Sequence, residues 1–233
     1  MLTRVWLNVD LGELPDEPEE LYACANVANV ACGGHAGDEA SMKRAIALCA
    51  VHGAALGAHP SYPDRDGFGR TRLAIAPDDL RRTLAEQCGA LAAIARAAGV
   101  TVAFVKPHGA LYHAARDEDA TAEALVAGAR EALGDVTIVG PPRGALAEAA
   151  ARAKLTFARE GFADRATRSD GSLVPRGEPG ALVLDPAAAA ARARALAAAG
   201  GIDTICVHGD TPGAVAVARA VRASLDALAG AGP

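Results

Sequence analysis

Six short apolar runs in this 233-residue chain each end in a cluster of glycine with histidine, aspartate, lysine or glutamate. A parallel α/β barrel brings the carboxyl ends of all its strands to one face, where active sites are built. The pattern therefore predicts such a barrel with a polar site on its rim, and five of the six histidines lie in or beside these turns. The runs read VWLNVDLGE, NVACGGHAGD, LGAHPSYPDR, FVKPHGALY, LTFAREGFADR and ICVHGD.

Runs rich in β-branched residues alternate with Ala/Leu/Arg stretches of helical period, which is typical of repeated βα units in an α/β fold. One domain over residues 1–233 is expected, because such barrels often run past about 200 residues as a single unit. Residues 160–183 have no sustained period and predict a long ordered loop over the rim. Strands are predicted at residues 4–10, 27–32, 54–58, 101–106, 136–140, 155–160 and 203–207, and helices at 39–52, 77–98, 119–133, 143–152, 186–199 and 211–228.

Composition excludes several classes of protein. The net charge of -5 has no basic stripe, so no nucleic-acid partner is expected. The most apolar long stretch, residues 185–200, contains two arginines, so no membrane segment is expected. Residues 1–10 have a strand-like run with one arginine in place of a secretory signal, which predicts a cytoplasmic protein.

The five cysteines are an odd number without CxxC spacing, so buried, reduced thiols are expected. Cys32 and Cys206 precede rim histidines, where a nucleophile is conceivable, but a buried thiol is the favoured interpretation.

The first rim cluster holds Asn8, Asp10 and Glu13. Alternation along a strand sends Asn8 and Asp10 to the same side, which faces the lumen of a barrel. An inward Asp at a strand end acts as a general base or holds a cation, and a cap or turn role is the alternative.

Two clusters combine histidine with glycine or proline. His35 lies in a turn with three glycines, where backbone N–H groups can approach a ligand, and Asp38 follows at a probable helix start that it can cap. His59 opens a loop that is stiffened by two prolines and carries Asp64 and Arg65, a set suited to holding a small polar substrate.

The remaining clusters place a lysine and further acids at strand ends. Lys106 ends a very apolar strand, so we expect it to meet an anion of the substrate or, as the alternative, to form an internal salt bridge with Asp10 or Glu160. Asp210 precedes Thr-Pro, and a helix cap and a catalytic role are equally open for it. No Walker A, GxGxxG, HExxH or GxSxG motif occurs.

Seven motifs in fixed order, DLGE, ANVACGGHAGD, GAHPSYPDRDGFGR, QCGAL, VKPHGALY, EGFADR and CVHGD, resemble the LamB/YcsF family over nearly the whole chain. The resemblance implies a distorted seven-stranded (β/α) barrel of the glycoside hydrolase/deacetylase superfamily. It also implies a 5-oxoprolinase activity, the ATP-dependent opening of the lactam of 5-oxo-L-proline to L-glutamate, with partner subunits B and C.

Carried over by motif, the resemblance implies two sets of site residues. The catalytic set is Asp10, His35, His59, Lys106, His108, Glu160, Asp164 and His208. The substrate-binding set is Asn8, Asp38, Asp64, Arg65, Tyr112, Arg165 and Asp210.

As a hypothesis for the reaction, ATP phosphorylates the carbonyl oxygen, Lys106 and Arg65 stabilise the phosphate, and Asp10 or His59 takes a proton from water.

Two other functions stay open. One is a divalent-metal-dependent hydrolase of amides or N-acetyl groups, with Asp10, His35, His59 and His208 as candidate ligands. The other is a non-catalytic binding subunit that is silent without its partners.

Overall fold

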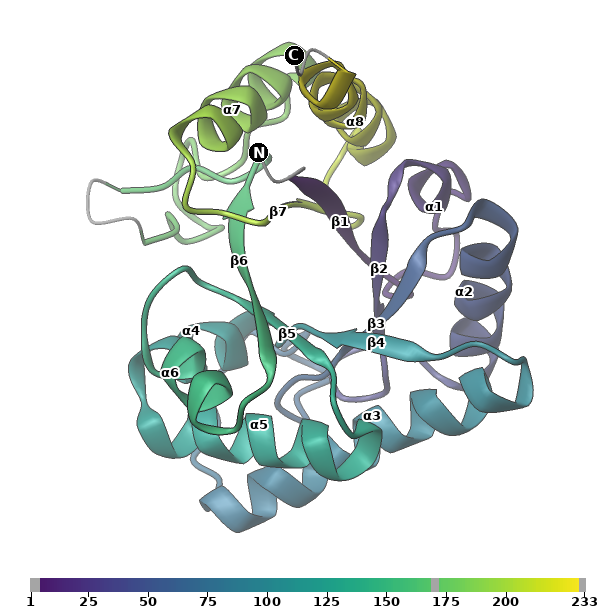
Figure 1. The fold of residues 1–233 in the computed structure, drawn as a ribbon, viewed down its shortest axis with the longest axis vertical. Coiled ribbons are helices and arrows are strands. Elements are labelled where there is room, and N and C mark those ends of the chain that lie inside the picture. Colours follow the sequence, from purple (N-terminus) through teal and green to yellow (C-terminus); the bar gives the residue numbers. More distant parts are fainter. Residues whose placement is uncertain (1–4, 169–171, 231–233) are drawn as a thin grey trace.

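Seven parallel strands close into one barrel in the computed structural model, which describes residues 5–168 and 172–230. Each strand pairs with the next in the chain, and β7 pairs with β1 to close the ring (Figure 1). All seven predicted strands are confirmed with ends shifted by a few residues, although residue 4 of the first one lies outside the described residues. The strands are β1 (Trp6–Leu11), β2 (Val27–Ala31), β3 (Ala55–His59), β4 (Val102–Val105), β5 (Thr137–Gly140), β6 (Thr156–Phe162) and β7 (Thr204–His208).

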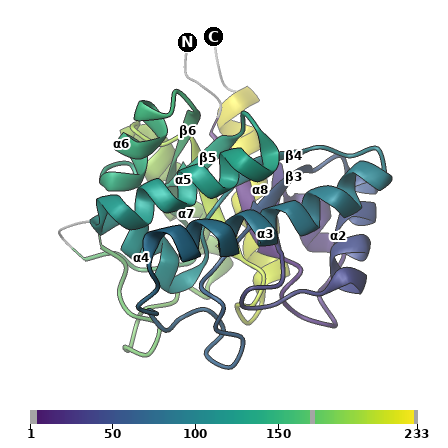
Figure 2. The ribbon, with the colours of Figure 1, turned by 90° about the horizontal axis from the view of Figure 1, so that it is seen from below.

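Helices surround this barrel, with α3 and α5 side by side along one flank (Figure 2) and α7 and α8 together on the opposite side of the ring (Figure 1). All six predicted helices are present. Two others were not predicted, because α1 is a single short turn and α4 begins at the Pro-His-Gly of a rim cluster, which we interpreted as loop. The helices are α1 (Glu20–Cys24), α2 (Glu39–His52), α3 (Pro77–Ala97), α4 (Gly109–Asp117), α5 (Asp119–Leu133), α6 (Ala145–Arg152), α7 (Pro186–Ala199) and α8 (Ala214–Gly230).

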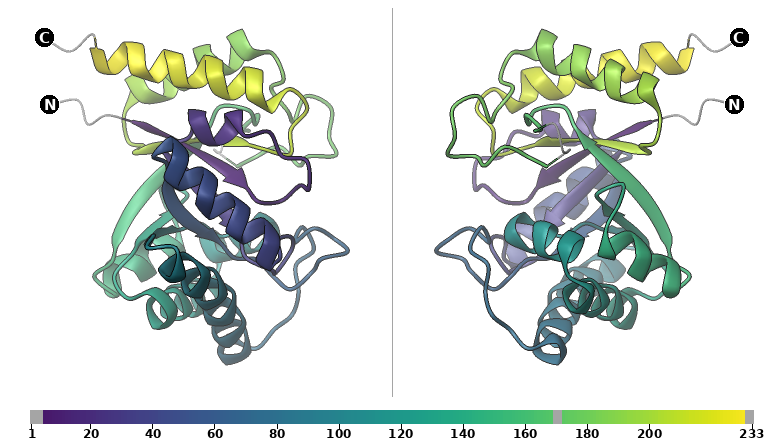
Figure 3. Two further views of the ribbon diagram at one scale, coloured as in Figure 1. Left: turned by 90° about the vertical axis from the view of Figure 1, so that its right-hand side faces the viewer. Right: turned by 90° about the vertical axis from the view of Figure 1, so that its left-hand side faces the viewer.

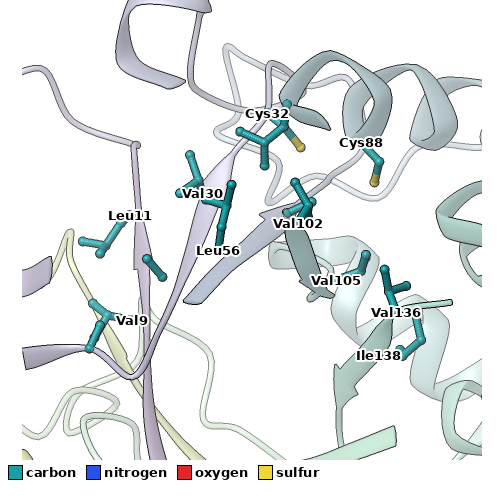
Figure 4. Packing of buried hydrophobic residues seen from close by; sticks show 14 of the residues in the cluster. Val9, Leu11, Val30, Cys32, Leu56, Cys88, Val102, Val105, Val136 and Ile138 are labelled. Atoms are coloured by element: carbon teal, nitrogen blue, oxygen red, sulfur yellow. The ribbon is translucent and has the colours of Figure 1, made fainter. Parts of the chain in front are cut away.

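The hydrophobic core lies between the sheet and the helices. Val9 and Leu11 of β1 are fully buried on the outer side of the sheet, and Val30 and Leu56 of the neighbouring strands pack in the same layer (Figure 4). Because alternate residues of a strand face opposite sides, the residues between these apolar ones point into the barrel. The sequence therefore leaves the lumen to polar side chains.

The loops that follow the strands project to one side, opposite the start of β1 and the end of α8 (Figure 3). The predicted rim loop at 160–183 begins later than expected, because β6 continues to Phe162. Beyond it, Arg165 forms an antiparallel bridge with Leu182, and Thr167 forms one with Leu173. Residues 169–171 of this segment lie outside the described residues. Within the described part of the chain, no helix combines the length and the apolar character that crossing a membrane requires.

Candidate active site

Polar side chains fill the lumen of the barrel. The Asn8 amide donates to Thr204 Oγ1 at 2.8 Å, and the Asn29 amide donates to Asn8 Oδ1 at 2.8 Å and to Asp10 Oδ1 at 2.9 Å. All four residues are buried, which confirms that Asn8 and Asp10 point inward. This hydrogen-bonded layer forms the base of the site, because a buried polar group is stable only with its partners in place.

The Lys106 ammonium lies between two carboxylates. Its Nζ is 2.9 Å from Asp10 Oδ1 and 2.9 Å from Glu160 Oε1, and it also contacts Cys206 Sγ at 2.9 Å. Burial alone would lower the lysine pKa, but Asp10, Cys206 and Glu160 raise it well above its ordinary value, so the amine stays charged.

This arrangement corrects the expected role of Lys106. Its three N–H groups have internal acceptors in Asp10, Cys206 and Asn8, so none is left for a phosphate or carboxylate of the substrate. The structure shows the internal salt bridge that was the alternative, with Asp10 and Glu160 together in place of one of them. Asp10 therefore holds a cation and caps no helix.

The two carboxylates beside Lys106 differ in their affinity for a proton. Burial opposes ionisation of Asp10, but His59, Lys106 and His208 lower its pKa below the ordinary value. Burial raises the pKa of Glu160, and Lys106 offsets this only in part. Asp10 is thus the permanent anion of the site, and Glu160 is the carboxyl that more readily takes up a proton.

Two neighbours of this ion pair are poor nucleophiles. Burial raises the pKa of the Cys206 thiol well above its ordinary value, and burial with the adjacent Glu160 does the same for the Tyr112 hydroxyl. All five cysteines are free and buried, as expected. A Cys206 nucleophile is therefore disfavoured, because the thiolate is the reactive form.

Asp164 and His208 form a pair at the ends of β6 and β7. The fully buried Asp164 accepts from the His208 backbone N–H at 2.8 Å, and its Oδ2 lies 3.0 Å from His208 Nδ1. Burial would raise the Asp164 pKa, but these contacts with His208 lower it below its ordinary value. A carboxylate oxygen only accepts, so Nδ1 of a neutral His208 carries the proton and Nε2 keeps its lone pair.

Three histidines surround the Glu13 carboxylate at the ends of β1 to β4. Glu13 Oε1 lies 3.0 Å from His35 Nε2, 3.1 Å from His108 Nδ1 and 3.7 Å from His59 Nε2. Burial lowers the His59 pKa to about 3, so the ring is neutral at pH 7. Phe68 packs against this group, with its ring centroid 5.4 Å from that of His35.

Glu13 and Phe68 are site residues that sequence reasoning missed. Glu13 stands in the first rim cluster but was not assigned to the site. Its histidine partners are far from it in the sequence, so no local motif indicates its role. Phe68 adopts a positive φ of 54°, which is rare for an aromatic residue, and its carbonyl accepts from His108 Nε2 at 2.9 Å. The only sequence signal for it was its place between two glycines of the GFGR segment.

The candidate metal ligands do not form one group. Asp10 and His208 lie together with Cys206, whereas His35 and His59 lie with two residues outside the candidate set, Glu13 and His108. Lys106 already neutralises the first group, so the second is the better cation site.

A cavity of about 650 Å³ opens on the rim. Seven of the assigned site residues line it: Asp10, His59, Lys106, His108, Tyr112, Arg165 and His208. The segment after β6 supplies much of the wall, through Arg165, Arg168 and residues 172–176. The predicted rim loop is therefore part of the cavity.

Five assigned substrate-binding residues are outside the cavity lining, namely Asn8 in the base, Asp210, and three in the rim loops, Asp38, Asp64 and Arg65. Asp38 is the N-cap of α2 and accepts from the Ser41 backbone N–H, which confirms the expected cap. The Asp64 carboxylate accepts from two backbone N–H groups of its own loop, and Arg65 donates to the Gly33 carbonyl at 3.0 Å. In this arrangement Asp38, Asp64 and Arg65 stabilise the rim loops.

Asp210 is not a helix cap, since α8 begins only at Ala214. Its carboxylate pairs with Arg70 at 2.6 Å and with Arg176 at 3.1 Å, and both arginines line the cavity. Asp210 therefore ties together two loops at the mouth of the cavity.

Comparisons with known proteins agree with this barrel. Residues 5–231 match the LamB/YcsF family. The chain is 44% identical to the A subunit of 5-oxoprolinase from Methylococcus capsulatus, with 97% of this chain and 94% of that protein covered. The solved structure of the lactam utilization protein from Thermus thermophilus is 36% identical and superposes with a TM-score of 0.88, covering 97% of each chain. A chitinase from Rhizomucor miehei, 10% identical over 94% of this chain and 99% of that one, has a TM-score of 0.51, a likeness of fold alone.

Proposed function

The chain belongs to the LamB/YcsF family, and we propose that it is the A subunit of a 5-oxoprolinase, which opens the lactam of 5-oxo-L-proline to L-glutamate. The names of two relatives, the A subunit of 5-oxoprolinase and the lactam utilization protein, support this substrate class. The proposal includes ATP as cosubstrate, partner subunits B and C, and a cytoplasmic location.

The proposal rests on Arg165, a buried arginine in the cavity lining with an unpaired Nε. It is 6% exposed and lines the cavity, and its Nη2 donates to the Val174 carbonyl at 2.6 Å. Its buried Nε has no hydrogen-bond partner among the described residues. Asp164 favours the charged form of Arg165, but a buried guanidinium with an unpaired Nε is costly, and the carboxylate of 5-oxoproline is an anion that suits its planar donors.

Arg165 differs in this respect from the arginines near it. Arg70 and Arg176 both pair with Asp210, so each already has a carboxylate partner in the protein. We therefore assign the substrate carboxylate to Arg165, with the lactam ring directed toward Asp10 and His208 deeper in the cavity.

Proton transfer is assigned to the pair formed by Asp164 and His208. Asp164 holds His208 in the tautomer whose free Nε2 faces the lumen, 3.8 Å from Asp10 Oδ2. A base placed in this way takes a proton from the water that attacks the lactam carbonyl and returns it to the departing ring nitrogen. Asp10 and Lys106 stabilise the arrangement, because their ion pair keeps a fixed negative charge beside the ring of His208.

ATP, when bound, would supply the phosphoryl group that activates the carbonyl oxygen of an otherwise unreactive amide, with ADP released in that transfer and inorganic phosphate released by a second water after the ring has opened. The mouth of the cavity fits such a phosphate, because Arg70 and Arg176 share the single carboxylate of Asp210 and the three groups together keep a net positive charge. Lys106 and Arg65, which we first expected in this role, are engaged elsewhere.

The test is glutamate release from 5-oxo-L-proline by this chain with subunits B and C and ATP, comparing wild type with Arg165→Gln. Loss of a charge-assisted pair worth about 1.5–3 kcal/mol should raise KM by roughly 10- to 150-fold. Arg159→Gln is the matched control, because Arg159 lies on β6 shortly before Arg165 but is outside the cavity lining, half exposed and paired with Asp203, and its KM should stay within about twofold. An unchanged KM for Arg165→Gln would overturn the carboxylate assignment.

Two further assays separate this function from its alternatives. Wild-type turnover without ATP and partner subunits would favour the simple amide hydrolase. A His208→Gln complex that assembles and keeps full activity would overturn the proton-transfer role of His208 and favour a non-catalytic binding subunit.

A further inference from the structure

Glu13, His59 and His108 meet at one point from the ends of three different strands. The distances between their facing atoms are 3.0 Å from His59 Nε2 to His108 Nδ1, 3.1 Å from His108 Nδ1 to Glu13 Oε1, and 3.7 Å from His59 Nε2 to Glu13 Oε1. All three side chains are buried, and His59 and His108 also line the cavity.

Backbone carbonyls determine which nitrogen of each ring carries hydrogen. His59 Nδ1 lies 2.7 Å from the Lys106 carbonyl, and His108 Nε2 lies 2.9 Å from the Phe68 carbonyl. A carbonyl oxygen only accepts, so both of these nitrogens are donors. In the neutral rings, the two nitrogens that face each other are then lone pairs, and Glu13 adds a carboxylate oxygen to the same point.

Three electron-pair donors in contact repel one another unless a proton or a metal ion lies between them. In a tetrahedral zinc site with bonds of about 2.0–2.1 Å, neighbouring ligand atoms are about 3.3 Å apart. The three measured distances lie on both sides of that value. A histidine that binds a metal also commonly donates its other N–H to a backbone carbonyl, as both rings do here.

His35 does not complete this set as a ligand. Its ring lies flat on that of His108, with centroids 3.6 Å apart and planes within 6° of parallel. An ion in the plane of the His108 ring would lie outside the plane of the His35 ring. His35 Nε2 instead reaches Glu13 Oε1 at 3.0 Å, where its N–H can orient the carboxylate.

The neighbouring group of Asp10, Cys206 and His208 has less need of a cation. Lys106 Nζ lies 2.9 Å from both Asp10 Oδ1 and Cys206 Sγ, so an ammonium already balances that charge. Both groups contain donors suited to a metal, but the group of Asp10, Cys206 and His208 already has the Lys106 ammonium beside it.

We propose that Glu13, His59 and His108 bind one divalent ion of the zinc type, with His35 as a positioning residue and the fourth coordination position open to the cavity. Two histidines and one glutamate with one open position are the ligand set of catalytic zinc sites, where water or a substrate oxygen takes the fourth place. The inference is independent of the proposed function, because it concerns ion binding by this chain alone.

The test begins with the full chain purified without chelators and analysed for metal by mass spectrometry. We expect about one zinc per chain, and, after exchange to Co²⁺, the intense visible absorption of a tetrahedral cobalt site. Less than about 0.1 equivalent of metal after incubation with zinc, or a weak octahedral cobalt spectrum, would overturn the proposal. These wild-type measurements do not depend on the folding of any variant.

Variants then identify the ligands, with folding checked by circular dichroism. Glu13→Gln and His108→Gln should lose the ion, whereas His35→Gln should retain it with an affinity about 10- to 100-fold weaker. His208→Gln is the matched control, since it removes a histidine from the neighbouring group, and it should bind zinc as the wild type does. Loss of zinc in His208→Gln, or wild-type binding in Glu13→Gln, would place the ion elsewhere. The glutamate-release assay is separate, so failure here leaves the proposed function standing.

Discussion

Replacing Lys106 by Met should destabilise the chain more than any surface substitution. The variant leaves Asp10 and Glu160, both 2% exposed, without the ammonium that now lies 2.9 Å from each. Removing one partner of a buried ion pair costs about 3–5 kcal/mol, and two acids share this lysine, so we expect a loss of about 5 kcal/mol. Lys43→Met, which removes a surface pair with Glu39, should cost at most about 1 kcal/mol.

A double-mutant cycle with Glu160→Gln tests the reason for this loss. Burial already raises the Glu160 pKa, so glutamine resembles the protonated form that this residue adopts most readily. Lys106→Met should therefore cost about 1–3 kcal/mol less when Glu160 is glutamine. The measurement is urea unfolding followed by circular dichroism at pH 7, with m-values compared. A loss below about 1 kcal/mol for Lys106→Met, or strict additivity in the double variant, would refute the reasoning.

Two further predictions concern the rim. Gly69 has a φ of +65°, and a Cβ there would lie 2.8 Å from His35 Cβ, whereas Gly99 has a φ of +72° with nothing within 4 Å. Gly69→Ala should therefore lower the unfolding free energy by about 1–3 kcal/mol more than Gly99→Ala does. Equal losses in urea unfolding would show that the rim loop shifts to accommodate the added Cβ. Asp164→Asn should cost about 1.5–3 kcal/mol at pH 7. Because the folded Asp164 pKa is lowered, its carboxylate stabilises the fold above the unfolded value of about 3.9, and this contribution is lost as the pH falls through the folded pKa. The difference between wild type and Asp164→Asn should therefore shrink below about pH 4, and a constant difference would argue against this role.

The barrel could be predicted because its signals are local. Each strand is an apolar run, each major helix has its own period, and the handful of residues after each strand must reach one face once the strands are parallel. The Asp38 cap is local in the same sense, since its partner Ser41 is three residues away. The helix α4 was missed because Pro107 and Gly109 are local signals for a turn, although its first turns bury Leu111 and Tyr112 against the barrel.

The roles of the site residues could not be predicted in the same way. The sequence predicted that Lys106 lies at the rim, but its partner Asp10 is 96 residues away. A local sequence pattern cannot predict that the ammonium contacts two internal acids. Glu13 was passed over because its three histidines come from other strands. Arg65 was assigned to a phosphate, but its guanidinium reaches two backbone carbonyls of a neighbouring loop.

By itself, the sequence determined the seven parallel strands, the face on which the polar residues gather and the family to which the chain belongs. Only the tertiary structure decided which of those residues neutralise one another and which are left for a ligand. The physical reason is that a charge buried in a barrel acts on whatever lies within a few ångströms, and closing the ring makes neighbours of residues such as Asp10, Lys106 and Glu160. Arg165 became a candidate for substrate binding because its Nε has no hydrogen-bond partner among the described residues. The group around Glu13 became a candidate for ion binding because the fold brings its donor atoms together.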